Sequence, residues 1–134
     1  MILGIDPGTK RLGVAVADTE THFARPLEVI DSGAVDPVAR IRTLVDELDV
    51  DVVVVGRPVG LSGRSGPAVE AQQELVVALR EALDVTVVEH DERLTTVVAD
   101  QGLRAGGAKR DTRKQLRDAV AAQVMLQGYL DSTS

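Results

Sequence analysis

The fold class is decided by ILGIDPGTKRLGVAVA, the sequence of residues 2–17. Met1 to Asp6 is predicted to form a buried strand that ends in a carboxylate, and Leu12 to Ala17 a second strand. The four residues between them, Pro7-Gly8-Thr9-Lys10, are typical of a tight turn, in which Gly8 is able to take a positive φ. Because the connection is short, the two strands should form an antiparallel hairpin.

The rest of the chain alternates strand and helix patterns. Phe23 to Ile30 is a weaker third strand, since Pro26 suits an edge strand or a bulge. Asp36-Pro37 predicts a helix start, with a cap residue followed by proline at the first helical position. Val52 to Val55 is an unbroken β-branched run, which favours a central strand covered on both faces. Three further helices are expected at about residues 67–83, 95–104 and 112–130. One further strand is expected at about residues 85–89.

This order of elements predicts an α/β protein with a mixed sheet. Three strands in a row should form an antiparallel meander, and each later strand should join the sheet through a helical crossover. We therefore expect a five-stranded mixed sheet, a three-strand antiparallel meander plus two parallel strands, with helices on both faces. A chain of 134 residues is expected to form one domain, residues 1–134.

Composition excludes several classes of protein. The chain has no cysteine, which excludes disulfides and thiolate zinc sites. It shows no secretory leader and no apolar run near 18 residues, so we expect a cytoplasmic protein without membrane contact. The aromatic residues are Phe23 and Tyr129, too few for base stacking on an aromatic platform.

Charge is distributed unevenly. The net charge is −6, yet residues 104–117 hold six basic residues and one acidic residue, Asp111. Because exposed charges more than about 8–10 Å apart are largely screened at physiological salt, a local basic patch can still bind phosphates. The same segment is equally compatible with a solvated loop and helix face.

Acidic residues stand where a parallel sheet would gather them. Asp6 ends the first strand, Asp91-Glu92 ends the last one, and Asp118 lies in the final helix. The carboxyl ends of parallel strands share one edge of a sheet, where ligands bind in open α/β folds. Crowded carboxylates repel one another unless a divalent cation lies between them, and Mg²⁺ and Mn²⁺ prefer such oxygen ligands. Asp91 and Glu92 face opposite sides of a strand, and the longer Glu92 is the preferred ligand.

Each acid also has a simpler interpretation. Asp6-Pro7-Gly8 is a common strand exit, Asp91-Glu92 could be an exposed strand end or a helix cap, and a helical aspartate such as Asp118 is usually solvated. If the three do converge, they would be the catalytic and metal-binding residues of a phosphodiesterase, with Asp6 bridging two metal ions. His90 is expected to support the site or the core rather than to bind metal.

Basic residues accompany these acids along the predicted rim. They would clamp substrate phosphates, and the basic segment before the last helix would extend the nucleic-acid-binding surface. The candidates are Lys10, Arg11, Arg57, Arg64, Arg93, Lys109, Arg110, Arg113 and Lys114.

Four motifs together resemble the YqgF/RuvX family from end to end. They are residues 4–15 (GIDPGTKRLGVA), residues 54–58 (VVGRP) with Ser62-Gly63, residues 91–96 (DERLTT) and residues 118–122 (DAVAA). The resemblance implies an RNase H-like fold related to the RuvC resolvases. It also implies a nuclease that processes the 5′ end of pre-16S rRNA with Mg²⁺ or Mn²⁺, using Asp6, Glu92 and Asp118.

The middle motif departs from the family pattern. Arg57 stands where the family commonly has Leu, and residues 59–62 lack the Asn and Asp often found there. RuvC-type resolvases also carry an acid after the middle strand, where this chain has Arg57-Pro58. The substrate contacts of this loop are therefore in doubt, whereas the presumed metal ligands are unaffected.

Three other functions remain open. Asp6-Pro7-Gly8-Thr9 with Gly13 resembles the phosphate loop of actin-like and sugar-kinase ATPases, but the chain is too short for their two domains. A non-catalytic RNA- or protein-binding factor could keep the fold and use its basic helix. A Holliday-junction or branched-DNA resolvase would share the chemistry but needs a dimer to place two cuts. The sequence shows no clear dimer seam, so we expect a monomer or weak homodimer acting on structured RNA.

Overall fold

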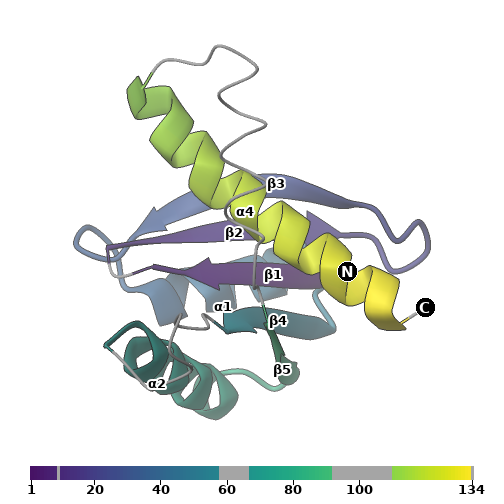
Figure 1. Ribbon diagram of the computed structural model, residues 1–134. Helices are drawn as coiled ribbons and strands as arrows, with labels where there is room; N and C mark the ends of the chain where they lie inside the picture. The colour runs from purple at the N-terminus through teal and green to yellow at the C-terminus, as the bar shows by residue number, and fades with distance from the viewer. Residues whose placement is uncertain (9, 58–66, 92–109, 134) are drawn as a thin grey trace.

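A computed structural model describes residues 1–8, 10–57, 67–91 and 110–133. Five strands and three helices lie in these ranges (Figure 1). The strands are β1 (Ile2–Pro7), β2 (Arg11–Ala17), β3 (Ala24–Asp31), β4 (Val52–Arg57) and β5 (Thr86–Asp91). The helices are α1 (Pro37–Leu48), α2 (Pro67–Ala82) and α4 (Arg110–Thr133). The helix expected at residues 95–104 falls outside the described residues.

The sheet has the predicted mixed topology. Its strand order is β3-β2-β1-β4-β5. The pairs β1–β2 and β2–β3 are antiparallel, whereas β1–β4 and β4–β5 are parallel. The antiparallel meander and the two parallel strands are therefore confirmed. The carboxyl ends of β1, β4 and β5 lie at one edge of the sheet, which we call the rim.

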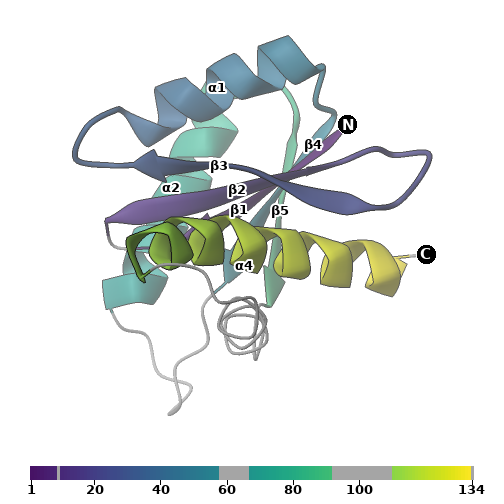
Figure 2. The same cartoon turned by 90° about the horizontal axis from the view of Figure 1, so that it is seen from above.

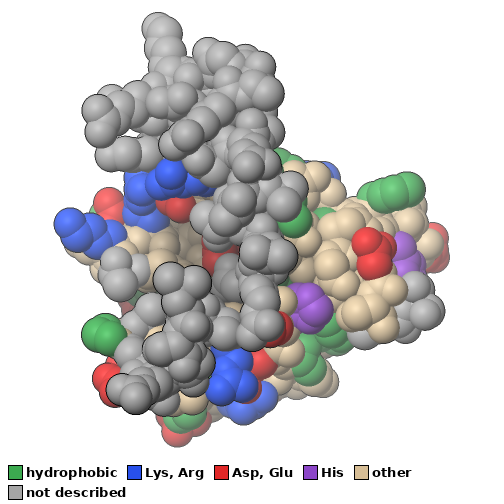
Figure 3. Space-filling model, viewed as in Figure 1, with side chains coloured by type: hydrophobic (Ala, Val, Ile, Leu, Met, Phe, Trp, Pro, Cys, Tyr) green, Lys and Arg blue, Asp and Glu red, His purple; other side chains and the backbone are tan. Residues whose placement is uncertain are grey.

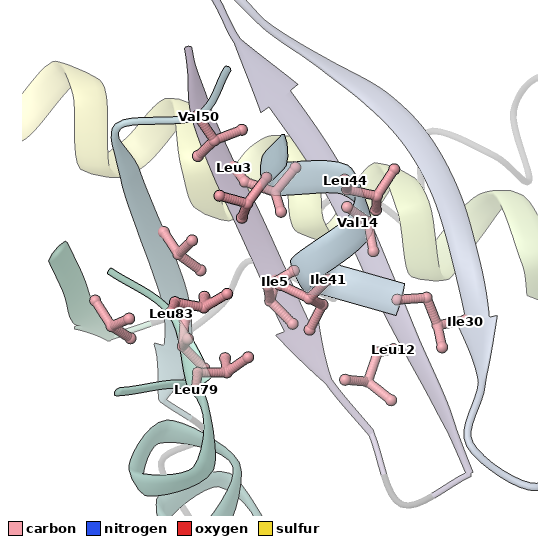
Figure 4. Close-up of a cluster of buried hydrophobic side chains, with 14 of the residues drawn as sticks. Leu3, Ile5, Leu12, Val14, Ile30, Ile41, Leu44, Val50, Leu79 and Leu83 are labelled. Carbon is pink, nitrogen blue, oxygen red and sulfur yellow. The ribbon is translucent and has the colours of Figure 1, made fainter. Parts of the chain in front are cut away.

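Helices cover both faces of the sheet, as expected (Figure 2). The α1 and α2 helices lie on one face and α4 crosses the other. Alternating residues of the strands point into the core beneath α1 and α2 (Figure 4). This core includes Leu3 and Ile5 of β1, Val14 of β2, Ile41 of α1 and Leu79 of α2, all fully buried.

Local sequence signals explain where several elements begin and end. The Asp36 side chain caps α1 by accepting a hydrogen bond from the Val38 backbone N–H at 3.1 Å, with Pro37 at the first helical position. The helix ends at Asp49, whose left-handed backbone (φ 54°) closes it. On β3, Pro26 lies on an edge strand next to a register shift opposite Val14 and Ala15, as its presence predicted.

Small residues let α4 approach the other face of the sheet closely. A Cβ on Gly4 of β1 would lie 2.9 Å from Leu126 Cβ. A Cβ on Gly13 of β2 would lie 1.7 Å from the carbonyl oxygen of Asp118, far closer than the 3.4–4 Å of an ordinary van der Waals contact. Ala15 and Ala122 are fully buried in the same layer. The backbone of α4 therefore rests directly on the sheet at the position of Asp118.

Two details of the hairpin differ from expectation. Gly8 does not adopt a positive φ; its lack of a side chain matters because a Cβ would lie 2.4 Å from the Arg11 carbonyl oxygen. The second strand begins at Arg11, one residue before the expected start at Leu12. Within the described ranges no helix combines the length and apolar character needed to cross a bilayer.

Candidate metal and nucleic-acid site

Asp6 and Asp118 lie on the same side of the sheet, next to each other. Along β1, Leu3 and Ile5 point into the core under α1 and α2, so Gly4 and Asp6 face α4. Asp6 is paired with Gly13 across the antiparallel β1–β2 ladder, where paired Cα atoms lie about 4.5–5.5 Å apart. Gly13 in turn contacts the backbone of Asp118. The glycine thus brings the two carboxylate-bearing residues to one point on the rim.

Asp118 is held there with its charge only partly compensated. Its side chain is 24% exposed, and its Oδ2 lies 3.1 Å from Nε of Arg11. This contact is an ion pair without hydrogen-bond geometry, and the buried Oδ2 accepts no hydrogen bond from the described residues. Burial raises the pKa of the Asp118 carboxyl, and the positive charges of Arg11 and Arg117 offset that effect only in part. A buried carboxylate oxygen without a donor fits a site for a cation.

Asp91, at the end of β5, lies on the opposite face of the sheet from Asp6 and Asp118. Val87 points into the core under α1 and α2, and Glu89 accepts a hydrogen bond from Gln72 of α2 at 2.8 Å. Because side chains alternate along β5, Asp91 belongs to the same face, opposite Asp6. Glu92 lies outside the described residues. No group of three His, Asp or Glu residues within the described ranges could hold a metal ion.

His90 faces α4 but points away from Asp118. Its ring meets Tyr129 edge-on, with centroids 5.9 Å apart, and its Nε2 lies 3.5 Å from where a Cβ on Gly128 would be. Gly128 follows Asp118 by about 15 Å along a helix. This packing against the carboxyl-terminal half of α4 agrees with a structural role for His90.

A cleft of about 740 Å³ opens beside Asp118. In the space-filling view, basic side chains with acidic ones among them gather around this end of β2 and β3 (Figure 3). The Ser32 hydroxyl donates to the Lys10 carbonyl oxygen at 2.9 Å, which ties the loop after β3 to the β1–β2 turn. The residues that line the cleft are Gly8, Lys10, Arg11, Asp31, Ser32, Gly33 and Asp118.

The other predicted nucleic-acid contacts lie at the end of β4, at the start of α4 or outside the described residues. Arg57 is exposed at the end of β4, where it pairs in register with Asp91. Arg110, Arg113 and Lys114 lie in the first turns of α4, which Figure 1 shows projecting past the edge of the sheet. Three candidates lie outside the described residues: Arg64, Arg93 and Lys109.

Two features of the site were missed from the sequence. The ion pair between Arg11 and Asp118 had no sequence signal, because it depends on where α4 crosses β2. The contact of Gly13 with α4 did have one, since glycine inside a strand often marks the close approach of another backbone.

Comparison with known proteins gives the family. Residues 1–132 match the family RuvX, described as "Holliday junction resolvase". A protein of Geobacillus kaustophilus named "Putative pre-16S rRNA nuclease" is 43% identical over 97% of this chain and 96% of its own length. A Bacillus thuringiensis protein of the same name is 44% identical over 98% of both chains.

Solved structures agree on the fold. T. thermophilus RuvC bound to a Holliday junction substrate superposes with a TM-score of 0.60 and 21% identity, covering 98% of this chain and 94% of that one. The fowlpox virus resolvase in complex with a Holliday junction gives a TM-score of 0.58 and 12% identity, covering 98% and 97%. The predicted RNase H-like fold is confirmed, and the chain belongs to the RuvX family.

Proposed function

We propose that this protein is a metal-dependent nuclease that hydrolyses phosphodiester bonds in structured RNA, with the 5′ end of pre-16S rRNA as its substrate. The observation that carries the proposal is the meeting of Asp6 and Asp118 at Gly13, beside a cleft lined by Lys10 and Arg11. Pre-16S rRNA is taken from the name of relatives that are 43–44% identical over nearly their full length, and its 5′ end from the family resemblance.

The residues at the rim have the oxygen donors that Mg²⁺ or Mn²⁺ requires. Asp6, Asp118 and Glu92 would hold the divalent ions. A divalent ion there would acidify an attacking water and stabilise the charge that develops on the leaving oxygen. Lys10 and Arg11, which line the cleft, would hold the substrate phosphates and keep the scissile bond in place.

The proposal is tested with purified protein, Mn²⁺ and a 16S rRNA precursor that carries its 5′ extension. We expect wild-type protein to shorten the precursor, EDTA to stop the reaction, and Asp6→Asn to leave no cleavage above the protein-free background. Asp46→Asn, an exposed substitution on α1 away from the rim, is the matched control and should retain activity. Cleavage that survives Asp6→Asn would contradict the metal site, and RNA binding without cleavage would instead favour a non-catalytic factor.

Junction resolution is the second candidate, because the family description names it. The same preparation should therefore be offered a four-way DNA junction beside the RNA. Symmetric paired cuts in the junction, with a dimer in solution, would favour the resolvase. Cleavage of the precursor alone would favour rRNA processing.

The basic start of α4 gives a further prediction. Replacing both Arg110 and Arg113 with Ala should weaken RNA binding and reduce the slope of log K against log salt by about 1 to 2, since each phosphate contact contributes roughly 0.7 to 0.9. Fluorescence anisotropy of labelled RNA across a salt series measures this slope. The double variant Arg25→Ala/Arg42→Ala removes the same charge from exposed positions away from the rim. An equal slope change in both variants would mean that α4 contributes only overall charge.

A further inference from the structure

Arg11 of β2 contacts the carboxylate of Asp118 of α4. As the first residue of β2 it shares the α4-facing side with Gly13, two residues later. The Nε–Oδ2 distance is 3.1 Å, 35% of the Arg11 side chain is exposed, and Arg11 is one of the residues that line the cleft. The guanidinium therefore touches the buried oxygen of a carboxylate that we assign to the metal site, while remaining accessible to a ligand in the cleft.

A second arginine–carboxylate pair in this protein provides a standard for comparison. Arg40 of α1 binds Glu28 of β3 through two hydrogen bonds, Nε to Oε2 at 2.9 Å and Nη2 to Oε1 at 2.7 Å. That two-point geometry is the strong form of the interaction. The Arg11–Asp118 pair has one close contact without hydrogen-bond geometry. It is the weaker pair, although its carboxylate is the one with a buried and otherwise unsatisfied oxygen.

The carboxylate of Asp118 can thus be better satisfied by another cation. Its buried Oδ2 accepts no hydrogen bond from the described residues and has a single close contact to Arg11. A divalent ion brings two charges and a direct bond to oxygen. A guanidinium at 3.1 Å from the same oxygen opposes that ion by like-charge repulsion.

We propose that Arg11 is an internal counter-cation of Asp118 that a divalent ion displaces, and that the displaced guanidinium then binds a substrate phosphate in the adjoining cleft. The inference rests on the proposed metal-dependent function. Metal binding and phosphate binding would then be cooperative, because the ion releases the arginine side chain that binds the substrate phosphate. Arg11 is thereby a positioning residue for Asp118 before the metal binds and a substrate contact afterwards.

The test compares Arg11→Gln, which removes the charge, with Arg11→Lys, which keeps it. Mn²⁺ affinity is measured by isothermal titration calorimetry without nucleic acid. We expect Arg11→Gln to bind Mn²⁺ about five- to tenfold more tightly than wild type, and Arg11→Lys to stay within about twofold. Arg42→Gln lowers the net charge equally from an exposed position on α1 and should leave the affinity unchanged. Thermal melts of all variants check that each is folded.

Cleavage kinetics provide a second and opposite signature. At saturating Mn²⁺, Arg11→Gln should raise KM for the RNA several-fold, because a phosphate contact is lost, while half-maximal activity is reached at lower Mn²⁺ than in wild type. A residue that only supports the fold would not move the two quantities in opposite directions. In an Asp118→Asn background, Arg11→Gln should no longer change Mn²⁺ affinity, because the carboxylate that contacts both Arg11 and the ion is absent.

The outcomes separate this inference from the proposed function. Unchanged or weaker Mn²⁺ binding by Arg11→Gln would overturn the counter-cation role even if the protein is an active nuclease. Tighter Mn²⁺ binding in a protein that cleaves no RNA would support the counter-cation role and contradict the nuclease. Absence of Mn²⁺ binding by wild-type protein would overturn both.

Discussion

Gly13→Ala is expected to destabilise the protein by about 3 kcal/mol or more and to abolish cleavage by the fraction that still folds. The new Cβ would lie 1.7 Å from the Asp118 carbonyl oxygen and 2.4 Å from its carbonyl carbon. Both are backbone atoms of a long helix, so no flexible side chain can move aside. The helix must shift by more than an ångström, which widens the gap between Asp6 and Asp118.

The effect is measured by denaturant unfolding, by Mn²⁺ titration and by cleavage per folded molecule. A loss of 3 kcal/mol corresponds to a fall in Tm of about 10 °C in a domain of this size. Gly128→Ala is the matched control, because its Cβ would lie 3.5 Å from His90 Nε2, an ordinary contact. Alanine there should stabilise α4 by about 0.5–1 kcal/mol and leave cleavage unchanged. Wild-type stability in Gly13→Ala would show that α4 does not rest on the sheet at this point.

The sheet could be predicted from the sequence because each strand carries its own signal. The run Val52 to Val55 is apolar at every position, and the structure places this strand between β1 and β5 with both faces covered. Pro26 favoured an edge strand or a bulge, and β3 is an edge strand with a register shift beside Pro26. Asp36-Pro37 located the start of α1 to the residue. These signals are local, so they can be interpreted without knowledge of the tertiary structure.

The site was harder to predict because it depends on contacts between distant elements. Strand ends indicated correctly that Asp6 lies at the rim. The partner of Asp118 could not be found this way, because a shift of α4 by one turn would place another residue over β2. Arg11 was therefore assigned to substrate binding alone, whereas the structure pairs it with Asp118.

Gly8 illustrates a different limit. Its position in Pro7-Gly8-Thr9-Lys10 favoured a positive φ, the commonest reason for glycine in a turn. The structure shows another reason, the 2.4 Å approach that a Cβ would make to the Arg11 carbonyl oxygen. Both reasons produce the same residue in the sequence. Which one applies is decided by how tightly the chain folds back, and this depends on the pairing of β1 with β2.

Glu92→Gln is expected to reduce cleavage on the order of 10²-fold or more, whereas Asp91→Asn should stay within about threefold of wild type. A bound divalent ion contributes several kcal/mol to the transition state, and about 3 kcal/mol corresponds to a factor of 10² in rate. The two substitutions are neighbours and each removes one negative charge. The structure places Asp91 with Val87 and Glu89 on the α2 side of β5, opposite Asp6. Glu92 is the ligand expected from the sequence.

This pair is measured by single-turnover cleavage of the RNA precursor together with Mn²⁺ titration. If Glu92 is a ligand, its substitution weakens Mn²⁺ binding, and raising the Mn²⁺ concentration restores part of the rate. Asp91→Asn should alter neither quantity. The reverse result would place the last carboxylate on the α2 side of the sheet, away from Asp6 and Asp118, and a metal site formed by Asp6, Glu92 and Asp118 at the rim would no longer explain the reaction.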